Sequence, residues 1–316
     1  MVGTPANSIN VSGSGIVGFN GTVFNSSTVT YHSLLIGGST SASIVNLGVA
    51  LNGQIPIGST GANPILKTLN QGPNITITNG AGSISIAGVG FSSVVRQTFT
   101  VTGSAQTYTP TSRMIYCDVE VVGGGGGGGG VAATSATVAA IAVGGGGGAG
   151  GYARKIFSAA QIGSSTTLNI GAGGSASGGA GTAGGATSFG WGTSFSATGG
   201  SGGASSALNY WGTDALGGLG GIGGGGNFNT RGTPGRPGFN FNPSLTGDVG
   251  YGISGAGGST FFGGGGLSKD STSYGAGLAA TSYGGGGSGA LTNISQAGAT
   301  GGNGFAGICI ITEYCG

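Results

Sequence analysis

The feature that most constrains this chain is a run of eight consecutive glycines, residues 123–130. Shorter glycine blocks recur towards the C-terminus, at residues 144–148, 263–266 and 284–287 among others. Glycine has no side chain with which to line an apolar core, and ordering it costs roughly 0.5–1 kcal/mol per residue relative to alanine. With 82 glycines, the chain is therefore either disordered or held together by something other than side-chain burial.

The composition argues against disorder. Only 4% of the residues are charged and the net charge is +2, whereas disordered segments combine low hydrophobicity with high net charge. The glycine blocks are also separated by segments that alternate β-branched and small residues, as strands do. A collagen-like structure is excluded because no Gly-X-Y period persists and only 8 prolines are present.

A packed array of polyproline-II helices would satisfy these constraints. Such a helix has three residues per turn, a rise of about 3.1 Å per residue and no internal hydrogen bonds. Its backbone groups must therefore bond to neighbouring helices, and glycine lets those backbones approach on every side. The sequence thus predicts a mainly β protein with almost no α-helix, in which the glycine blocks form this array and the intervening segments form loops at its ends.

Residues 1–90 differ in pattern from the rest of the chain. A repeat of about 21 residues aligns residues 33–37 with residues 54–58, and a weaker third copy covers residues 74–86. Each unit offers two short strand-like segments with few large apolar residues, so one unit cannot bury enough surface to fold alone. We expect an elongated fibre with a repetitive β-shaft that intertwines with other copies of the chain; a monomeric β-solenoid is the alternative.

Residues 91–316 are predicted to form a second, glycine-rich domain, framed by strands near 95–122 and 305–315. In residues 115–122 apolar side chains alternate with others that include Asp118 and Glu120, which is typical of a half-exposed strand. The odd number of cysteines does not indicate a disulfide framework. We expect Cys117 and Cys309, in the first and last of these strands, to be buried thiols.

The order of motifs in this second region resembles a known family. The motifs are Gln97–Thr100, Tyr108–Pro110, Val119–Val122 followed by polyglycine, Gly144–Lys155, Leu168–Gly174, Ala186–Gly190, Ser196–Gly203 and Gly301–Tyr314. In this order they resemble the glycine-rich domain of bacteriophage tail-fibre and tail-tip proteins, over roughly residues 95–316. The N-terminal repeats resemble the shaft repeats of phage fibres. The resemblance implies a distal adhesin in which polyproline-II helices form a sandwich and loops at its tip bind the host receptor.

The sequence contains no convincing catalytic or metal-binding pattern. Gly-x-Gly-x-x-Gly recurs, but no helix follows it and no acidic residue lies between Glu120 and Asp214. The single histidine, His32, lies in the repeat region, which argues against a Ser-His-Asp triad. The six carboxylates are too dispersed for a metal site. We therefore predict a protein that is not an enzyme and has no cofactor and no metal ion.

Scattered basic residues argue against nucleic acid as a partner, and the longest apolar stretch is too short for membrane insertion. Aromatic residues between the glycine blocks are instead the candidates for receptor binding, because aromatic faces beside amides hold sugars or protein surfaces. Packing against the ends of the glycine helices, or between chains, is the alternative. The candidates are Trp191, Tyr210, Trp211, Phe228, Arg231, Arg236, Phe239 and Phe241, and the loop expected at residues 227–242 ranks first.

The sequence therefore predicts a homotrimeric tail-fibre subunit of a virion, an adhesin that attaches to a host surface glycan or outer-surface protein. The alternative is a structural protein that polymerises into an extracellular or cell-surface filament by adding strands to a neighbour's sheet. Assembly distinguishes the two, because a fibre forms closed trimers and a filament grows open-ended.

Overall fold

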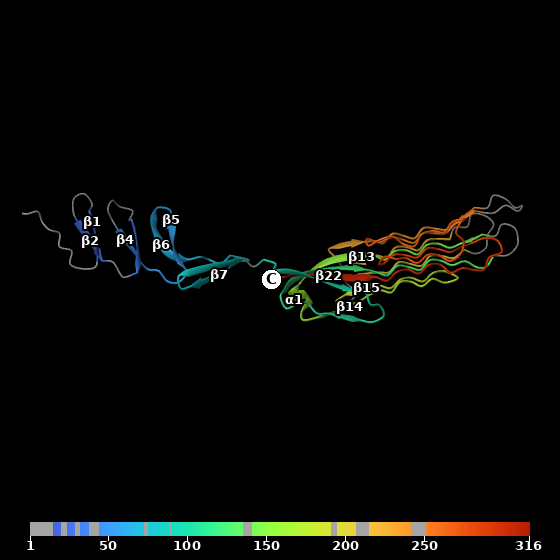
Figure 1. Cartoon of the computed structure of the whole chain (residues 1–316), viewed down its shortest axis with the longest axis horizontal. Coiled ribbons are helices and arrows are strands. Elements are labelled where there is room, and N and C mark those ends of the chain that lie inside the picture. The colour runs from blue at the N-terminus through green and yellow to red at the C-terminus, as the bar shows by residue number, and fades with distance from the viewer. Residues whose placement is uncertain are drawn as a thin grey trace, which may run out of the picture. The chain divides into compact units, whose positions relative to one another are not determined.

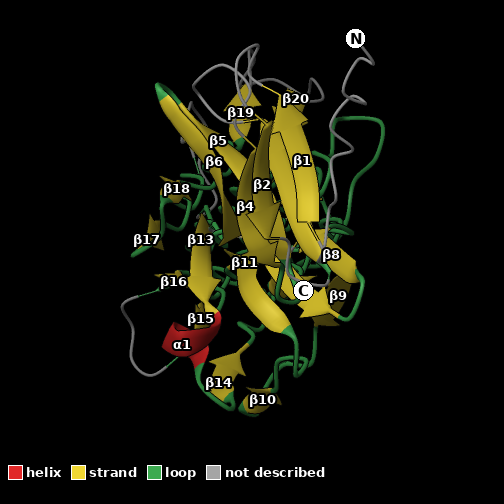
Figure 2. Cartoon of the chain, turned by 90° about the vertical axis from the view of Figure 1, so that its left-hand side faces the viewer, coloured by secondary structure: helices red, strands yellow, loops and turns green. Residues whose placement is uncertain are grey.

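The computed structural model describes residues 15–19, 24–28, 32–37, 44–72, 75–88, 90–134, 141–190, 195–206, 215–241 and 251–316. The chain separates into two compact units, Met1–Gly90 and Phe91–Gly316. Across the described residues, strands dominate and the one helix is α1, Ala159–Ile162 (Figures 1 and 2). The predicted mainly β composition with almost no helix is confirmed. No helix in the described part of the chain has the length and apolar character that a membrane span requires.

The first unit consists of antiparallel hairpins. They pair β1 (Gly15–Phe19) with β2 (Phe24–Thr28), β3 (Ser33–Gly37) with β4 (Ile44–Val49), β5 (Gln54–Ser59) with β6 (Ala62–Thr68), and β7 (Ile75–Gly80) with β8 (Ser83–Gly88). Each pair is a two-stranded sheet by itself among the described residues. Two-stranded hairpins are marginally stable at best in water, so this unit depends on further contacts.

The hairpin of β7 and β8 has one apolar and one polar face. Its register pairs Ile77 with Ile86 and Asn79 with Ile84, and side chains two residues apart share a face. Four isoleucines therefore lie together, and we call Ile75, Ile77, Ile84 and Ile86 the isoleucine face. The opposite face carries threonine and serine. Ile86 is 61% exposed, so nothing described in this chain covers the isoleucine face fully.

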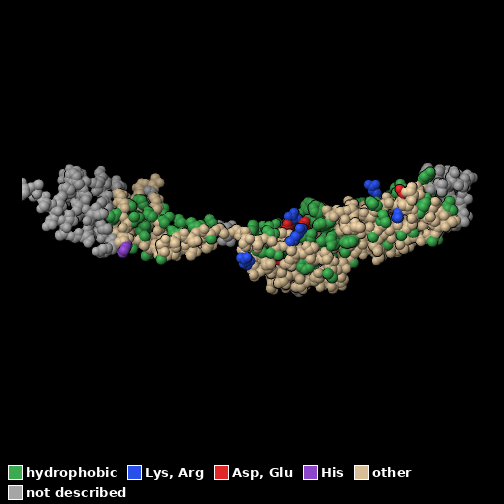
Figure 3. All heavy atoms as spheres, in the orientation of Figure 1, with side chains coloured by type: hydrophobic (Ala, Val, Ile, Leu, Met, Phe, Trp, Pro, Cys, Tyr) green, Lys and Arg blue, Asp and Glu red, His purple; other side chains and the backbone are tan. Residues whose placement is uncertain are grey.

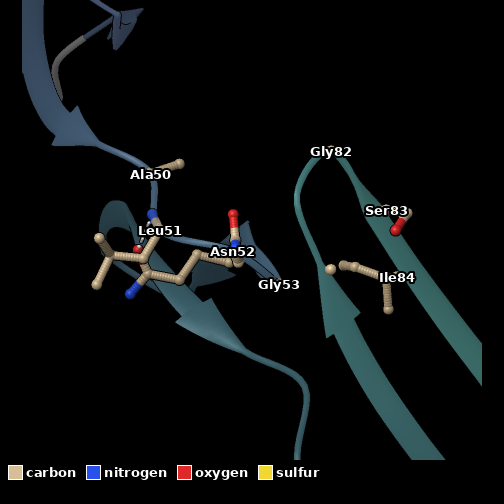
Figure 4. A pocket seen from close by; sticks show the side chains of 9 residues that line it. Ala50, Leu51, Asn52, Gly53, Gly82, Ser83 and Ile84 are labelled. Atoms are coloured by element: carbon tan, nitrogen blue, oxygen red, sulfur yellow. Dashed lines mark hydrogen bonds between the residues drawn. The ribbon is translucent and has the colours of Figure 1, made fainter.

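The connection between β4 and β5 approaches the hairpin of β7 and β8. The turn before β5 faces the turn between β7 and β8 across a solvent-open hollow of about 330 Å³ (Figure 4). Gly53 has a φ of +77°, and a Cβ there would lie 2.0 Å from the side chain of Asn79. Glycine is thus required at this position both for its conformation and for the close approach of Asn79.

The second unit contains two five-stranded sheets. The strands of the first sheet lie in the order β18 (Phe228–Thr230), β13 (Tyr152–Ser158), β11 (Met114–Val122), β22 (Ile308–Cys315) and β9 (Ser93–Phe99). The strands of the second sheet lie in the order β10 (Gln106–Tyr108), β14 (Thr166–Asn169), β15 (Thr187–Phe189), β16 (Ser196–Ala197) and β17 (Gly223–Gly224). In the first sheet β11 and β22 pair from Val122 opposite Ile308 to Tyr116 opposite Tyr314. The two strands that flank the glycine-rich region are therefore side by side.

The main apolar core of this unit lies on the inner face of the first sheet, against the second. Its buried members include Tyr108, Cys117, Val119, Leu168, Phe189, Phe195, Cys309 and Ile311. Glu313 is also fully buried, and its Oε1 accepts hydrogen bonds from Tyr108 Oη and Gln97 Nε2, each at 2.8 Å. Cys117 and Cys309 are buried free thiols, as expected.

Beyond the sheets, glycine-rich segments run side by side through the rest of the unit (Figure 1). The N–H groups of residues 123–131 donate to three neighbours in strict rotation, at 2.7–3.1 Å: residues 145–151, then 179–185, then 299–305. Every third residue therefore bonds to the same neighbour. The carbonyls of the same segment accept from three other segments, residues 171–178, 198–204 and 284–290.

These six neighbours surround residues 123–130 with backbone. A Cβ built on any of the eight glycines would meet a backbone atom at 2.3 Å or less, so no other residue fits without displacing a neighbouring segment. We call the bonded segments 123–131, 144–151, 171–185, 198–204, 215–222, 231–238, 255–258, 276–280, 284–290 and 299–305 the glycine array. At its end away from β13, β12 (Ala142–Val143) pairs with β21 (Leu291–Thr292), and β19 (Phe239–Phe241) pairs with β20 (Tyr251–Ile253).

Candidate functional site

The structure describes the positions of five of the eight predicted receptor-binding residues. Phe228 lies in β18, at the edge of the first sheet, whereas Phe239 and Phe241 lie in β19, at the other end of the array. Arg231 and Arg236 lie between them and are exposed. Trp191, Tyr210 and Trp211 fall outside the described residues. The five described candidates therefore lie apart, from the edge of the first sheet to the far end of the array, and do not form one cluster.

The prediction that residues 227–242 form a loop is wrong for most of this range. Phe228–Thr230 and Phe239–Phe241 are strands, and residues 231–238 between them are a segment of the glycine array. The N–H groups of Gly232 and Gly235 donate to the carbonyls of residues 221 and 218 at 2.9 Å. Arg236 exchanges backbone hydrogen bonds with two further segments, donating to Ala256 and accepting from Gly146. A glycine at every third position was sufficient for this segment to join the array, despite its prolines and arginines.

An exposed apolar ridge runs along the neighbouring segment. Leu216, Leu219 and Ile222 are 69%, 63% and 52% exposed. Between them, Gly218 and Gly221 donate their N–H groups to the interior carbonyls of residues 146 and 149 at 2.8 Å. Because the array repeats every three residues, glycines take the inward positions and the large side chains all take the outward one.

The predicted arginine segment lies beside this ridge. Isolated bridges pair Ile222 with Arg231 and Ala215 with Gly238 in antiparallel register. The same register places Leu219 opposite Pro234 and Leu216 opposite Pro237. We call these residues, Leu216, Leu219, Ile222, Arg231, Pro234 and Pro237, the array ridge. Sequence reasoning missed its leucines, although the triplets Gly-Gly-Leu and Gly-Gly-Ile at residues 217–222 already carry the period of three.

A second group, of charged and aromatic side chains, lies on the outer face of the first sheet. Asp118 forms an ion pair with Arg154, whose Nε lies 2.8 Å and 3.0 Å from the two carboxylate oxygens. Tyr152 donates its hydroxyl to Glu120 at 2.6 Å. The rings of Phe228 and Phe261, both largely exposed, lie 6.1 Å and 5.3 Å from the Tyr152 ring. We call these six residues the outer-sheet group.

The charges of the outer-sheet group are fixed by their neighbours. The hydrogen bonds from Arg154 to Asp118 raise the pKa of the guanidinium, so it stays a cation. Burial, followed by the hydrogen bond to Glu120, raises the pKa of Tyr152, so its hydroxyl remains a donor. Figure 3 shows how sparse charge is elsewhere on the face in view, where acidic and basic side chains occur in small separate groups. The group therefore presents aromatic rings beside a defined ion pair.

The described residues offer little reactive chemistry. Burial raises the pKa of the Cys117 thiol to about 11, which keeps it protonated and unreactive at neutral pH. Among the described residues, no three His, Cys, Asp or Glu side chains are grouped so that they could hold a metal ion. The arrangement of the array ridge and the outer-sheet group suits binding.

Residues 99–314 match the family model of the glycine-rich domain. The chain belongs to this glycine-rich domain family. The match begins at the last residue of β9 and ends in β22, so the family's domain comprises the second sheet, the first sheet apart from most of β9, and the whole glycine array. The hairpins of the first unit lie outside it. No curated protein matches the chain in sequence.

Proposed function

We propose that this member of the glycine-rich domain family is a phage tail-fibre subunit, carried on the virion, that acts as an adhesin for the host cell surface. The order of motifs described above supports the link to phage fibres, and the first unit, with its repeated hairpins, has the organisation of a shaft. Such a protein needs neither a reaction nor a cofactor.

We further propose that the segments of the array are polyproline-II helices. The three-residue period of the hydrogen bonds supports this, since that helix has three residues per turn. Successive side chains of the array ridge would then be spaced about 9 Å apart, at about 3.1 Å of rise per residue. A scaffold bonded on all sides holds such side chains at fixed positions, which reduces the entropy lost on binding.

The observation that carries the proposal is the array ridge itself. Apolar side chains that remain exposed in a row, rather than singly, mark an interaction surface. Arg231 stands at one end of the ridge, and arginine is enriched among the residues that dominate binding energy. An outer-surface protein of the host suits an apolar ridge better than a glycan does.

Binding to bacterial cells tests this proposal. Purified labelled protein is mixed with cells of a strain panel, and adsorption is compared between the wild type and Leu219→Lys. We expect the variant to adsorb at least tenfold less than the wild type, because the substitution would place a charge at the centre of the ridge. Leu278→Lys is the matched control, since residues 276–280 bond to residues 288 and 299–303 and share no neighbour with residues 215–222.

Treating the cells identifies the class of receptor. If brief proteolysis of the cells abolishes adsorption and periodate does not, the receptor is a protein; the reverse result identifies a glycan. Equal adsorption of both leucine variants, or no adsorption of the wild type to any strain, would refute the assignment to the ridge.

We propose that the functional form is a homotrimer held by the first unit. The isoleucine face and the two-stranded sheets support self-association, because other copies would cover the apolar face and multiply the host contacts. The unpaired edges of those same hairpins favour the filament as the second candidate. Sedimentation over a hundredfold range of concentration separates a closed trimer of constant size from an open polymer that lengthens.

A further inference from the structure

A pocket lies on the opposite side of β13 from the outer-sheet group. Successive residues of a strand point to opposite faces, so Lys155 faces away from Arg154. The pocket has a volume of about 230 Å³ and lies between β13, α1, β14 and the hairpin of β15 and β16. The lining residues used below are Lys155, Phe157, Gln161, Phe189 and Phe195. None of them belongs to the array ridge.

The floor of this pocket is aromatic and rigid. Phe157 lies 5.4 Å from both Phe189 and Phe195, measured between ring centroids. Phe189 and Phe195 are almost fully buried in the main core, so their rings cannot swing away. A volume of about 230 Å³ corresponds to roughly seven water molecules at about 30 Å³ each. The pocket therefore suits one ring and no extended chain.

Two hydrogen-bond donors at the pocket have unused capacity. The Lys155 ammonium lies 5.1 Å from the centre of the Phe157 ring, and no carboxylate of the described residues pairs with it. Gln161 is held by the capping box of α1, in which its Oε1 accepts from the Ser158 N–H at 2.9 Å. That bond leaves the Gln161 Nε2 as a donor, and it has no partner in the described part of the chain.

We propose that this pocket binds a small carboxylate that carries a ring. The ring lies on the phenylalanine floor, and the carboxylate accepts hydrogen bonds from Lys155 Nζ and Gln161 Nε2. Two donors beside an apolar floor select an anion over a neutral ring, because charge-assisted hydrogen bonds are about twice as strong as neutral ones. Two sources share this chemistry: a terminal uronic-acid sugar of a polysaccharide, and an aromatic acid. The inference rests on the pocket alone and not on the proposed fibre function.

The test is a titration of the full-length protein with small-molecule probes, in which binding is measured by ligand-observed NMR. The probes are methyl β-glucuronide and benzoate, with methyl β-glucoside and benzamide as their neutral counterparts. We expect one of the two acids to bind at least tenfold more tightly than its neutral counterpart. Binding of the glucuronide identifies the sugar source, and binding of benzoate alone identifies the aromatic source.

Two variants address the two donors without disturbing the fold. Lys155→Met keeps an unbranched apolar stem over Phe157 and removes the charge, so affinity should fall about tenfold, to that of the neutral probe. Gln161→Glu keeps the acceptor for the Ser158 N–H but replaces the donor with a negative charge, so binding should be lost. Lys269→Met, on the segment that leads away from residues 263–266, is the control and should bind as the wild type does.

The proposal is overturned if neither acid binds at about 50 mM, a concentration that detects even weak affinities. It is equally overturned if the acids bind no better than their neutral counterparts, or if Lys155→Met and Lys269→Met bind alike.

Discussion

The hairpins of the first unit and the glycine array of the second are both made of extended segments, yet they are stabilised in opposite ways. In a hairpin each strand bonds to one partner, and stability depends on side chains that cover one face, such as Ile77 and Ile86. In the array, residues 123–130 bond to six neighbours, and the surrounding backbone leaves no room for a Cβ at any of these eight positions. Removing side-chain atoms should therefore destabilise the hairpins, whereas adding a Cβ to a glycine should destabilise the array.

The two sheets of the second unit join these two modes of packing. Their core is formed by side chains, with Tyr108 and Phe195 among the largest fully buried ones. Their strands β11 and β13 continue directly into the array at residues 123 and 151. A conventional core thus fixes where the glycine segments begin, and the array then propagates by backbone hydrogen bonds.

The largest effect is expected from Gly126→Ala. Its Cβ would lie 2.0 Å from the carbonyl oxygen of Ser201, and that oxygen belongs to a segment which is itself packed on several sides. We expect a loss of at least about 4 kcal/mol in the free energy of unfolding of the second unit, measured by chemical denaturation with circular dichroism.

Gly178→Ala is the matched control for this substitution. A Cβ at Gly178 would meet nothing within 4 Å, so the same methyl group should be neutral or stabilise by about 0.4–1 kcal/mol through the unfolded chain. If both variants retained wild-type stability, the array would not be packed by its backbone, and the contrast with the hairpins would disappear.

The next largest effect should come from the side-chain core. Tyr108→Phe removes the hydroxyl that donates to the buried Glu313 at 2.8 Å, and an under-satisfied buried acceptor costs about 1–3 kcal/mol. The control is Tyr116→Phe, because Tyr116 is partly exposed and its ring would still stack on Tyr314. Equal unfolding free energies for the two variants would show that the Glu313 network contributes nothing to stability.

The strands could be predicted from the sequence because they obey local rules. Alternation in residues 115–122 indicated β11, and the near absence of helix followed from the lack of helical periodicity. The role of residues 231–238 could not be predicted in the same way. Arg231, Pro234 and Arg236 have the composition of a loop, and only the hydrogen bonds that Gly232 and Gly235 donate to residues 221 and 218 show that they belong to the array.

The receptor candidates illustrate the same limit of local reasoning. Aromatic and basic residues were singled out by type, and of these Phe228 and Arg231 are exposed. The exposed leucines of the array ridge were passed over because leucine normally lies in a core. Because the inward positions of residues 215–222 are taken by glycines that have no room for a Cβ, the leucines of this segment are forced outward and the usual rule is reversed.

Alkaline pH should destabilise the side-chain core through its buried thiols, whereas the glycines of the array have no group that titrates. Burial raises the pKa of Cys117 from 9.0 to about 11, and burial also raises the pKa of Cys309. Between pH 9 and 10 the unfolded chain therefore loses thiol protons that the folded protein retains, and stability falls as pH rises. We expect a loss of about 1 kcal/mol per thiol over that interval.

The measurement is the free energy of unfolding at pH 8, 9 and 10 for the wild type and for Cys117→Val. Between pH 9 and 10 the variant should lose about 1 kcal/mol less stability than the wild type, because one of the two thiols no longer titrates. A slope unchanged by the substitution would show that Cys117 ionises equally in both states. Tyr108 and Tyr152, whose pKa values are also raised by burial in the folded protein, add a loss near pH 10 that both proteins share, so the difference between them reports Cys117.

The smallest effect on a single chain, and the sharpest test of the comparison, is expected from Ile86→Thr. The substitution keeps a β-branched residue in β8, and Ile86 is already 61% exposed, so an isolated hairpin should change by at most about 0.5 kcal/mol. In the proposed trimer the same side chain lies against other copies, and the variant should dissociate at a concentration at least tenfold higher than the wild type, as measured by sedimentation equilibrium.

Ser85→Thr, on the polar face of the same hairpin, should leave the assembly unchanged. If the two variants dissociate at the same concentration, the isoleucine face does not hold the chains together, and the stability of the first unit must come from contacts along its edges, as it would in an open filament.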